Sequence, residues 1–333
     1  MIKVILYGLG ETNREIAKAI LDKKNIEIVG IVDKDPQKLK YFIDKILGVH
    51  KLKARAAEKF SDISNLKADL VIHSTTPLLK DVCEQLEECL NAGYNVLTTS
   101  EEVAFPIGRN EDVIKKLDDI AKRKGARLLG TGSNPGFVMD TLVLLLTAMC
   151  RKMKSITVTR VEDLSKREAD MKNRAGLGMN TGEFEENARK KIVGHIGLAE
   201  SAAMIADALG IKSVKVESSI KPVLKERPKK KLAQFKQKDI IGFSQKAWIT
   251  VGREKLISLN LDIYWDAQPC QEIIIDGEPG INIKLNNIES KTTTAAVVVN
   301  SIPKMFRGSH GYRTMKDVCL PCMVFSDFAK FVK

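Results

Sequence analysis

A glycine pair near the amino terminus constrains the fold of this chain more than any other feature. Residues 2–7 form a short apolar run that stops at Gly8, and Gly10 then opens a segment whose apolar residues recur at helical spacing. A second apolar run, Ile26–Val32, ends directly before Asp33. The order of strand, glycine turn, helix, strand and acid is typical of the first half of a parallel α/β sheet.

Short apolar runs and amphipathic stretches continue to alternate up to about residue 135, which favours a parallel sheet with helices on both faces. After about residue 151 the apolar positions alternate residue by residue, as in antiparallel strands. We therefore expect an α/β protein in which a Rossmann-type parallel sheet domain spans residues 1–135. An α+β domain with a mixed sheet is expected at 136–291, for substrate binding and oligomerisation. Residues 292–333 are expected to pack back on the first domain.

The glycine turn and the distal acid together predict a dinucleotide site. Gly8 permits the tight turn, and Gly10 lets the backbone approach a pyrophosphate at the positive end of the following helix. Asn13 replaces the third glycine of the usual motif, which implies either a wider approach of helix and strand or a side chain that reaches a phosphate. Asp33 is placed to accept the ribose hydroxyls of NAD and to repel the extra phosphate of NADP, a repulsion that Lys34 partly offsets. We expect NAD, with NADP possible.

Further cofactor contacts are expected where the strands end, because parallel sheets bind ligands outside the carboxyl ends of their strands. These candidates carry hydroxyl groups: Thr12, Ser74, Thr75, Thr76 and Ser100. The alternative is a buried sheet with capped helices and no ligand.

The net charge of +12 does not by itself indicate a nucleic-acid partner. The densest basic run, 225–231, contains a proline and no aromatic residue, and aromatics make up only 5% of the chain. Because stacking platforms for bases need aromatic side chains, we expect a solvated basic surface and no nucleic acid.

Membrane and metal sites are not expected either. The longest apolar run, 141–150, is shorter than the roughly 18 residues that a membrane span needs, and no signal peptide is visible. Six cysteines are scattered along the chain, and the pair Cys319 and Cys322 has no second pair to complete a zinc site. We expect a cytoplasmic protein with reduced thiols and no bound metal.

Two segments in the middle of the chain resemble a known family. The sequences GTGSNPGFVMD (130–140) and GLGMNTGEFEENARKKIVGHIGLAESAAMIADALG (176–210) are similar to the NAD(P)-dependent amine dehydrogenases related to dihydrodipicolinate reductase, the family of 2,4-diaminopentanoate dehydrogenase. With the amino-terminal motif, the resemblance spans most of residues 1–210. The paired histidines and the Lys-Pro-Ser-Gly-Thr segment of true dihydrodipicolinate reductases are absent, which disfavours that activity.

The resemblance implies NAD(P)-dependent oxidative deamination of a small diamino acid such as 2,4-diaminopentanoate. Imine reductases and homoserine- or aldehyde-type dehydrogenases remain alternatives, because one fold serves related reactions. A non-catalytic nucleotide-binding sensor is a further alternative. A homodimer or homotetramer is expected.

Deamination needs groups that move protons and activate water. His195, flanked by glycine residues, is the leading candidate because an imidazole pKa near 6.5 allows proton transfer in either direction. Glu101 follows a crevice-lining strand, where a carboxylate can act as a base. Asn134 is a candidate for orienting the amine or the carboxamide of the cofactor. The structural alternatives are a packed histidine, a solvated acid and an ordinary turn.

Substrate contacts are expected from three further residues. Ser133 lies beside Asn134 in the same turn, and Arg174 or Arg313 is expected to bind the substrate carboxylate. Arginines in loops are more often only solvated. The glycine-rich stretch 174–182 is either a lid that excludes water or a plain surface loop.

Overall fold

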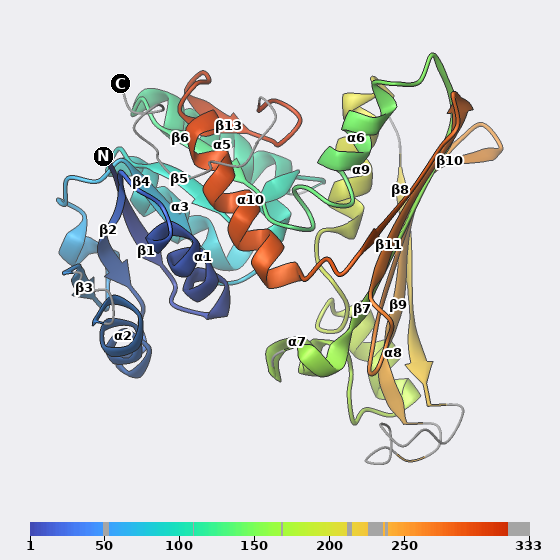
Figure 1. Cartoon of the computed structure of the whole chain (residues 1–333), viewed down its shortest axis with the longest axis horizontal. Coiled ribbons are helices and arrows are strands. Elements are labelled where there is room, and N and C mark those ends of the chain that lie inside the picture. The colour runs from blue at the N-terminus through green and yellow to red at the C-terminus, as the bar shows by residue number, and fades with distance from the viewer. Residues whose placement is uncertain are drawn as a thin grey trace. The chain divides into compact units, whose positions relative to one another are not determined.

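The computed structural model describes residues 1–48, 53–108, 110–167, 169–211, 215–225, 236 and 239–318 (Figure 1). The chain divides into two compact units, Met1–Val138 with Glu289–Lys333, and Met139–Ile288. The sequence placed these boundaries after residues 135 and 291, three residues from each observed position. Cys319 and Cys322, and residues 226–231 of the basic run, lie outside the described residues.

The first unit is built on a parallel sheet of seven strands among the described residues. In spatial order these are β13 (Gly311–Arg313), β6 (Arg127–Gly130), β5 (Asn95–Thr98), β4 (Leu70–His73), β1 (Ile2–Tyr7), β2 (Ile26–Val32) and β3 (Arg55–Ala57). The chain moves outward from β1 through β2 to β3 and then returns to the other side of β1 at β4. This reversal creates a topological switch point between β1 and β4, where such sheets bind ligands. The predicted Rossmann-type sheet is confirmed.

Helices of the first unit follow the strands. They are α1 (Glu11–Leu21), α2 (Pro36–Phe42), α3 (Leu79–Asn91), α4 (Glu101–Ala104), α5 (Asn110–Arg123) and α10 (Ser290–Met305), with a π-helical turn at Ile43–Leu47 and a 3₁₀ turn at Phe60–Ile63. In α5 the first turn is acidic and the last turn is basic, which suits the helix dipole.

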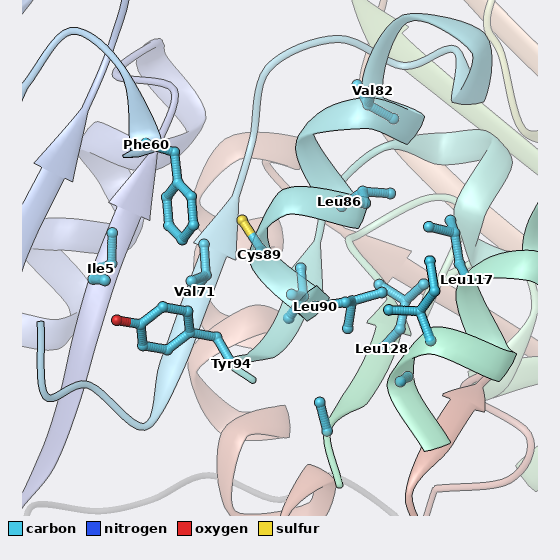
Figure 2. Close-up of a cluster of buried hydrophobic side chains, with 14 of the residues drawn as sticks. Ile5, Phe60, Val71, Val82, Leu86, Cys89, Leu90, Tyr94, Leu117 and Leu128 are labelled. Atoms are coloured by element: carbon cyan, nitrogen blue, oxygen red, sulfur yellow. The ribbon is translucent and has the colours of Figure 1, made fainter. Parts of the chain in front are cut away.

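The core on one side of this sheet forms around α3, whose buried residues recur at intervals of three and four (Figure 2). Val82, Leu86, Cys89 and Leu90 of this helix gather with Val71 of β4, Leu117 of α5 and Leu128 of β6. Burial of each such large apolar side chain is worth about 1.5–3 kcal/mol. This packing fixes α3, and with it the loop that leaves β4.

The carboxyl-terminal segment completes the first unit. Helix α10 packs beside α1, and β13 extends the sheet by pairing in parallel with β6 (Figure 1). Glu289 caps α10 by accepting hydrogen bonds from the backbone of Lys291 and Thr292.

The second unit contains a mixed sheet, as predicted. Its strand order is β12 (Ile281–Asn286), β11 (Cys270–Glu278), β7 (Lys152–Asp163), β10 (Glu254–Tyr264), β9 (Ile240–Val251) and β8 (Val216–Leu224), and only β7 and β10 run parallel among the described pairs. The helices are α6 (Thr141–Thr147), α7 (Ala169–Arg174), α8 (Thr181–Arg189) and α9 (Leu198–Ala208), with a 3₁₀ turn at Leu164–Lys166. Helix α9 packs on β8, β9 and β10. In the described part of the chain, no helix has the length and apolar character required to cross a membrane.

Candidate active site

The glycine turn after β1 is formed as the sequence predicts, and its two glycines have different roles. Gly8 has φ of +83°, and a Cβ at this position would stand 2.4 Å from the carbonyl oxygen of Ser74. Only glycine fits there. Gly10 is the N-cap of α1 and has no side chain with which to cap the helix. A Cβ built on it meets no atom within 4 Å. Space is therefore open beside Gly10, whereas Glu11, the first residue of α1, pairs with Lys291 of α10 at 2.6 Å and Thr12 is half-buried.

Asn13 does not have the role predicted from the sequence. Its side chain is fully buried, and its amide nitrogen donates to the carbonyl oxygens of Gly8 at 2.6 Å and Tyr7 at 3.0 Å. The phosphate contact expected of Asn13 is therefore wrong, because the side chain points into the turn and holds it from beneath. No residue of the described chain donates a hydrogen bond to its Oδ1 atom.

Asp33 lies at the end of β2 and is connected to the glycine turn. Its Oδ2 accepts a hydrogen bond from the backbone N–H of Leu9 at 2.6 Å, and its Oδ1 accepts one from Asp35 at 2.9 Å. A carboxylate has about four lone-pair sites, so two remain for ribose hydroxyls. Lys34 is exposed beside it.

The loops after β4 and β5 are held together by hydroxyl groups. Thr99 donates to the hydroxyl of Ser74 at 2.8 Å, and Ser100 donates to the carbonyl oxygen of Thr76 at 2.7 Å. Thr75 and Thr76 are exposed, whereas Ser100 is buried. The predicted hydroxyl candidates thus lie at one edge of the sheet, although Ser100 serves the loop itself.

Glu101 begins α4 and is half-buried. The neighbouring Glu102 is buried, and its Oε2 accepts a hydrogen bond from the backbone of Leu79 at 2.8 Å, which gives it a structural role. The helix is pressed against β6, because a Cβ on Gly130 would stand 2.5 Å from the backbone of Val103. Glu101 is therefore carried on a rigid support.

The turn after β6 contains Ser133 and Asn134. The backbone N–H of Ser133 donates to the hydroxyl of Thr294 on α10 at 3.1 Å, and Asn134 is half-buried. Thr131, two residues earlier, is buried, and its hydroxyl finds no partner among the residues that the structure describes. A buried polar group without a partner is costly, so this hydroxyl marks a place for water or a bound group. Sequence analysis did not identify it.

Arg313 lies on the edge strand β13. Its guanidinium donates to the hydroxyl of Ser309 and packs against Gly308. These contacts hold the turn before its own strand and give no support to a substrate role.

His195 and Arg174 belong to the second unit, and their surroundings are described within it. Gln245 clamps the backbone of His195, accepting its N–H at 2.8 Å and donating to its carbonyl oxygen at 2.9 Å. Burial, with Arg174 nearby, lowers the pKa of His195 from 6.5 to about 3. This shift moves the pKa of His195 away from the ordinary imidazole value on which its predicted proton-transfer role depends, and a ring with this pKa is neutral near pH 7.

Both arginine and glutamate side chains act on His195: Arg174, Arg167 and Arg160 lower its pKa, and Glu162 raises it. Arg174 donates to the carbonyl oxygen of Gly194 at 2.9 Å. Arg160 is fully buried and donates to Glu162 at 2.7 Å and to Gln271 at 2.9 Å. Sequence analysis missed Arg160, although it continues the buried alternation of its strand and an arginine at such a position is rare.

Comparisons with known proteins decide the family. Residues 137–333 match the family model described as the 2,4-diaminopentanoate dehydrogenase C-terminal domain, and residues 1–97 match one described as C2185-like, N-terminal. The 2,4-diaminopentanoate dehydrogenase of Acetoanaerobium sticklandii is 30% identical over 99% of this chain and 97% of its own length. The chain belongs to the 2,4-diaminopentanoate dehydrogenase family. The resemblance identified from the sequence is thus confirmed.

One solved structure agrees in fold with this member of the 2,4-diaminopentanoate dehydrogenase family, and a further relative is similar in sequence over part of the chain. The structure of amine dehydrogenase from Mycobacterium smegmatis superposes with a TM-score of 0.84 at 22% identity, covering 96% of this chain and 97% of that one. A 4-hydroxy-tetrahydrodipicolinate reductase from Dictyoglomus turgidum is 25% identical over 44% of this chain and 50% of its own length.

As a member of the 2,4-diaminopentanoate dehydrogenase family, the chain is an oxidoreductase that acts on amines and uses a nicotinamide cofactor. The residues of the first unit fit such a group. The open start of α1 at Gly10 suits a diphosphate, and the remaining lone pairs of Asp33 suit a ribose.

Proposed function

We propose that this chain catalyses the NAD(P)-dependent oxidative deamination of a small diamino acid such as 2,4-diaminopentanoate. An amine, water and NAD(P)⁺ would give an oxo amino acid, ammonia, NAD(P)H and a proton. The observation that carries this proposal is the 30% identity over 99% of the chain to a relative named for that activity. A bound nicotinamide would supply the hydride acceptor for the carbon that carries the amine.

Glu101 is proposed to move protons in this reaction. Removing the proton of the substrate ammonium exposes the lone pair that expels hydride, and a base must later deprotonate the water that attacks the substrate imine. Glu101 supports this role because it is half-buried and lies on a helix packed against the sheet. Asn134 and Ser133 are proposed to orient the substrate amine and the cofactor carboxamide.

Arg174 is proposed to bind the substrate carboxylate beside a neutral His195. Among the residues that the structure describes, Arg174, Arg167 and Arg160 lower the pKa of His195 and Glu162 raises it, and Glu162 is itself paired with Arg160 and Arg167, so Arg174 is the arginine left to meet an anion. A site with this excess of positive charge favours an anionic group. We propose that His195 contributes as a neutral hydrogen-bonding group and not as an acid.

NAD is proposed as the preferred nucleotide. Asp33 supports this choice because its carboxylate lies at the end of β2, next to the turn where the ribose is expected. NADP, with its additional phosphate, would meet this negative charge.

We also propose a homodimer or homotetramer that acts in the cytoplasm. The alternating strands of the second unit support this assembly, because strands of this kind commonly pair across a dimer axis. Light scattering of the purified protein would test the assembly, and a monomer would contradict it.

Absorbance of the reduced nucleotide tests the reaction. Incubation with a panel of diamino acids and NAD should produce NADH only with the correct substrate. A flat trace with every diamino acid and both nucleotides, alongside tight nucleotide binding, would favour the non-catalytic sensor. Turnover only with cyclic imines and NAD(P)H would favour an imine reductase.

A further inference from the structure

A buried histidine lies at the end of β4, near the glycine turn expected to bind the cofactor, and has no part in the chemistry proposed above. His73 is the last residue of β4 and is completely buried. Its Nδ1 lies 3.0 Å from the hydroxyl of Thr98, the last residue of β5, and its Nε2 lies 2.7 Å from the side-chain oxygen of Gln85 on α3. One imidazole thus joins three elements of the first unit.

The direction of these hydrogen bonds follows from their partners. The oxygen of Gln85 only accepts, so Nε2 of His73 carries the hydrogen. The backbone N–H of Ser100 donates to the hydroxyl oxygen of Thr98 at 3.1 Å, and that hydroxyl is left to donate to Nδ1. Burial lowers the pKa of His73 from 6.5 to about 4, which is consistent with a neutral ring. Each of these hydrogen bonds then has a defined donor and acceptor.

The network reaches the glycine turn at one end. The hydroxyl of Thr75 lies 3.2 Å from Nε2 of His73 and donates to Gln85 at 3.0 Å. The methyl group of Thr75 comes within 2.7 Å of the position that a Cβ on Gly8 would occupy. Thr75 therefore packs directly against the turn expected to bind the diphosphate.

The other end of the hydrogen-bond network around His73 reaches Glu101. Ser100, whose backbone N–H bonds Thr98, is the N-cap of α4, and Glu101 is the first residue of that helix. A shift at His73 would therefore move the cofactor turn and Glu101 relative to each other.

We propose that His73 is a positioning residue that holds the loops after β4 and β5 in one arrangement, aligning the glycine turn with Glu101. The part of this proposal that concerns Glu101 rests on the proposed function, whereas the part that concerns nucleotide binding does not. His73 touches neither substrate nor cofactor and acts through Thr75 and Thr98.

Two substitutions of His73 each remove one of its two hydrogen bonds, and so test the two ends of this network separately. In His73→Asn, the side-chain oxygen replaces Nδ1 as the acceptor for Thr98, and the bond to Gln85 is lost. The NAD dissociation constant should rise about tenfold, the equivalent of one buried hydrogen bond, while kcat changes little. In His73→Gln, the amide donates to Gln85 but the acceptor for Thr98 is lost. Here kcat should fall about tenfold or more with little change in NAD binding.

Thr98 and an exposed residue of α3 provide the controls. Thr98→Val should reproduce the effect of His73→Gln, and Thr98→Ser, which keeps the hydroxyl, should restore kcat. Glu84→Gln changes an exposed neighbour of Gln85 and should leave both parameters unchanged. Thermal unfolding would report any loss of folded protein.

The proposal is overturned if all variants of His73 and Thr98 lose thermal stability while NAD binding and kcat per folded molecule stay at the wild-type values. Wild-type protein that binds NAD but oxidises no diamino acid would instead refute the proposed function. In that case calorimetry of His73→Asn with NAD still decides the role of His73, and an unchanged dissociation constant would refute it.

Discussion

The carboxylate of Asp33 accepts a hydrogen bond from the backbone N–H of Leu9, with 2.6 Å between Oδ2 and the nitrogen. This bond joins the end of β2 to the glycine turn after β1. Asp33 therefore holds the turn that we expect to bind the diphosphate, and it keeps lone pairs that could accept hydrogen bonds from a ribose.

Asp33→Ala should weaken the binding of both nucleotides, because the turn loses an anchor that NAD and NADP share. NAD should lose more, since the ribose contact is lost as well, and the combined loss is expected to be about tenfold or greater. Calorimetric titration of the variant with each nucleotide measures the two changes. Equal losses would show that Asp33 acts on the turn alone.

Gly8 and Gly10 form a matched pair for a second test. Gly8→Ala forces a Cβ against the carbonyl of Ser74 at positive φ, so the free energy of unfolding should fall by about 1–3 kcal/mol even without nucleotide. Gly10→Ala adds a methyl group to open space at φ of −67°, so the unliganded protein should keep its stability. That methyl group would occupy the expected diphosphate position, and stabilisation by NAD should disappear. Thermal unfolding with and without NAD measures both effects, and normal stabilisation of Gly10→Ala would contradict the assigned phosphate site.

Sequence analysis predicted the parallel sheet, the glycine turn and the mixed second sheet because these depend on local patterns. Apolar spacing and glycine positions carry that information directly. Strand β13 was not foreseen, because it is three residues long and pairs with β6 from a distant part of the chain.

The site was less predictable than the fold. Asn13 occupies a motif position associated with the cofactor, yet its amide bonds the carbonyl of Gly8, and the direction of a side chain is not encoded in motif spacing. The link between His73, Gln85 and Thr98 joins residues that no motif connects. The pKa of His195 likewise depends on burial and on arginines brought together by folding.

The histidines make stability depend on pH. His195 and His73 have folded-state pKa values of about 3 and about 4, below the ordinary value of 6.5. The unfolded chain therefore binds more protons than the folded chain in this window, and stability falls as pH drops from 6.5 toward these values. His195→Asn should flatten this fall in a series of thermal unfolding curves. An unchanged dependence on pH would mean that His195 titrates normally in the folded protein.

The same pKa shift predicts the pH dependence of activity. Because His195 is neutral throughout the range of about pH 5.5–8, its titration cannot produce a change in kcat there. His195→Gln should therefore lower kcat by a constant factor across this range and leave the shape of the profile intact. Loss of an acidic limb in the variant would restore His195 as the proton-transfer group.

Arg174 provides the sharpest test of substrate binding. Its guanidinium is held by the carbonyl of Gly194, and it is the leading cause, after burial, of the lowered pKa of His195. Arg174→Gln should reduce kcat/KM for a diamino acid by about 10–100-fold, the usual effect of losing a charge-assisted hydrogen bond. For an amine without a carboxylate, the same variant should match the wild type.

Lys172→Gln, two residues away on α7, is the control, because it also removes one positive charge but leaves Arg174 in place. The ammonium of Lys172 lies over the ring of Trp265. Equal losses with both kinds of amine would mean that Arg174 supports the structure of the second unit and does not bind the carboxylate.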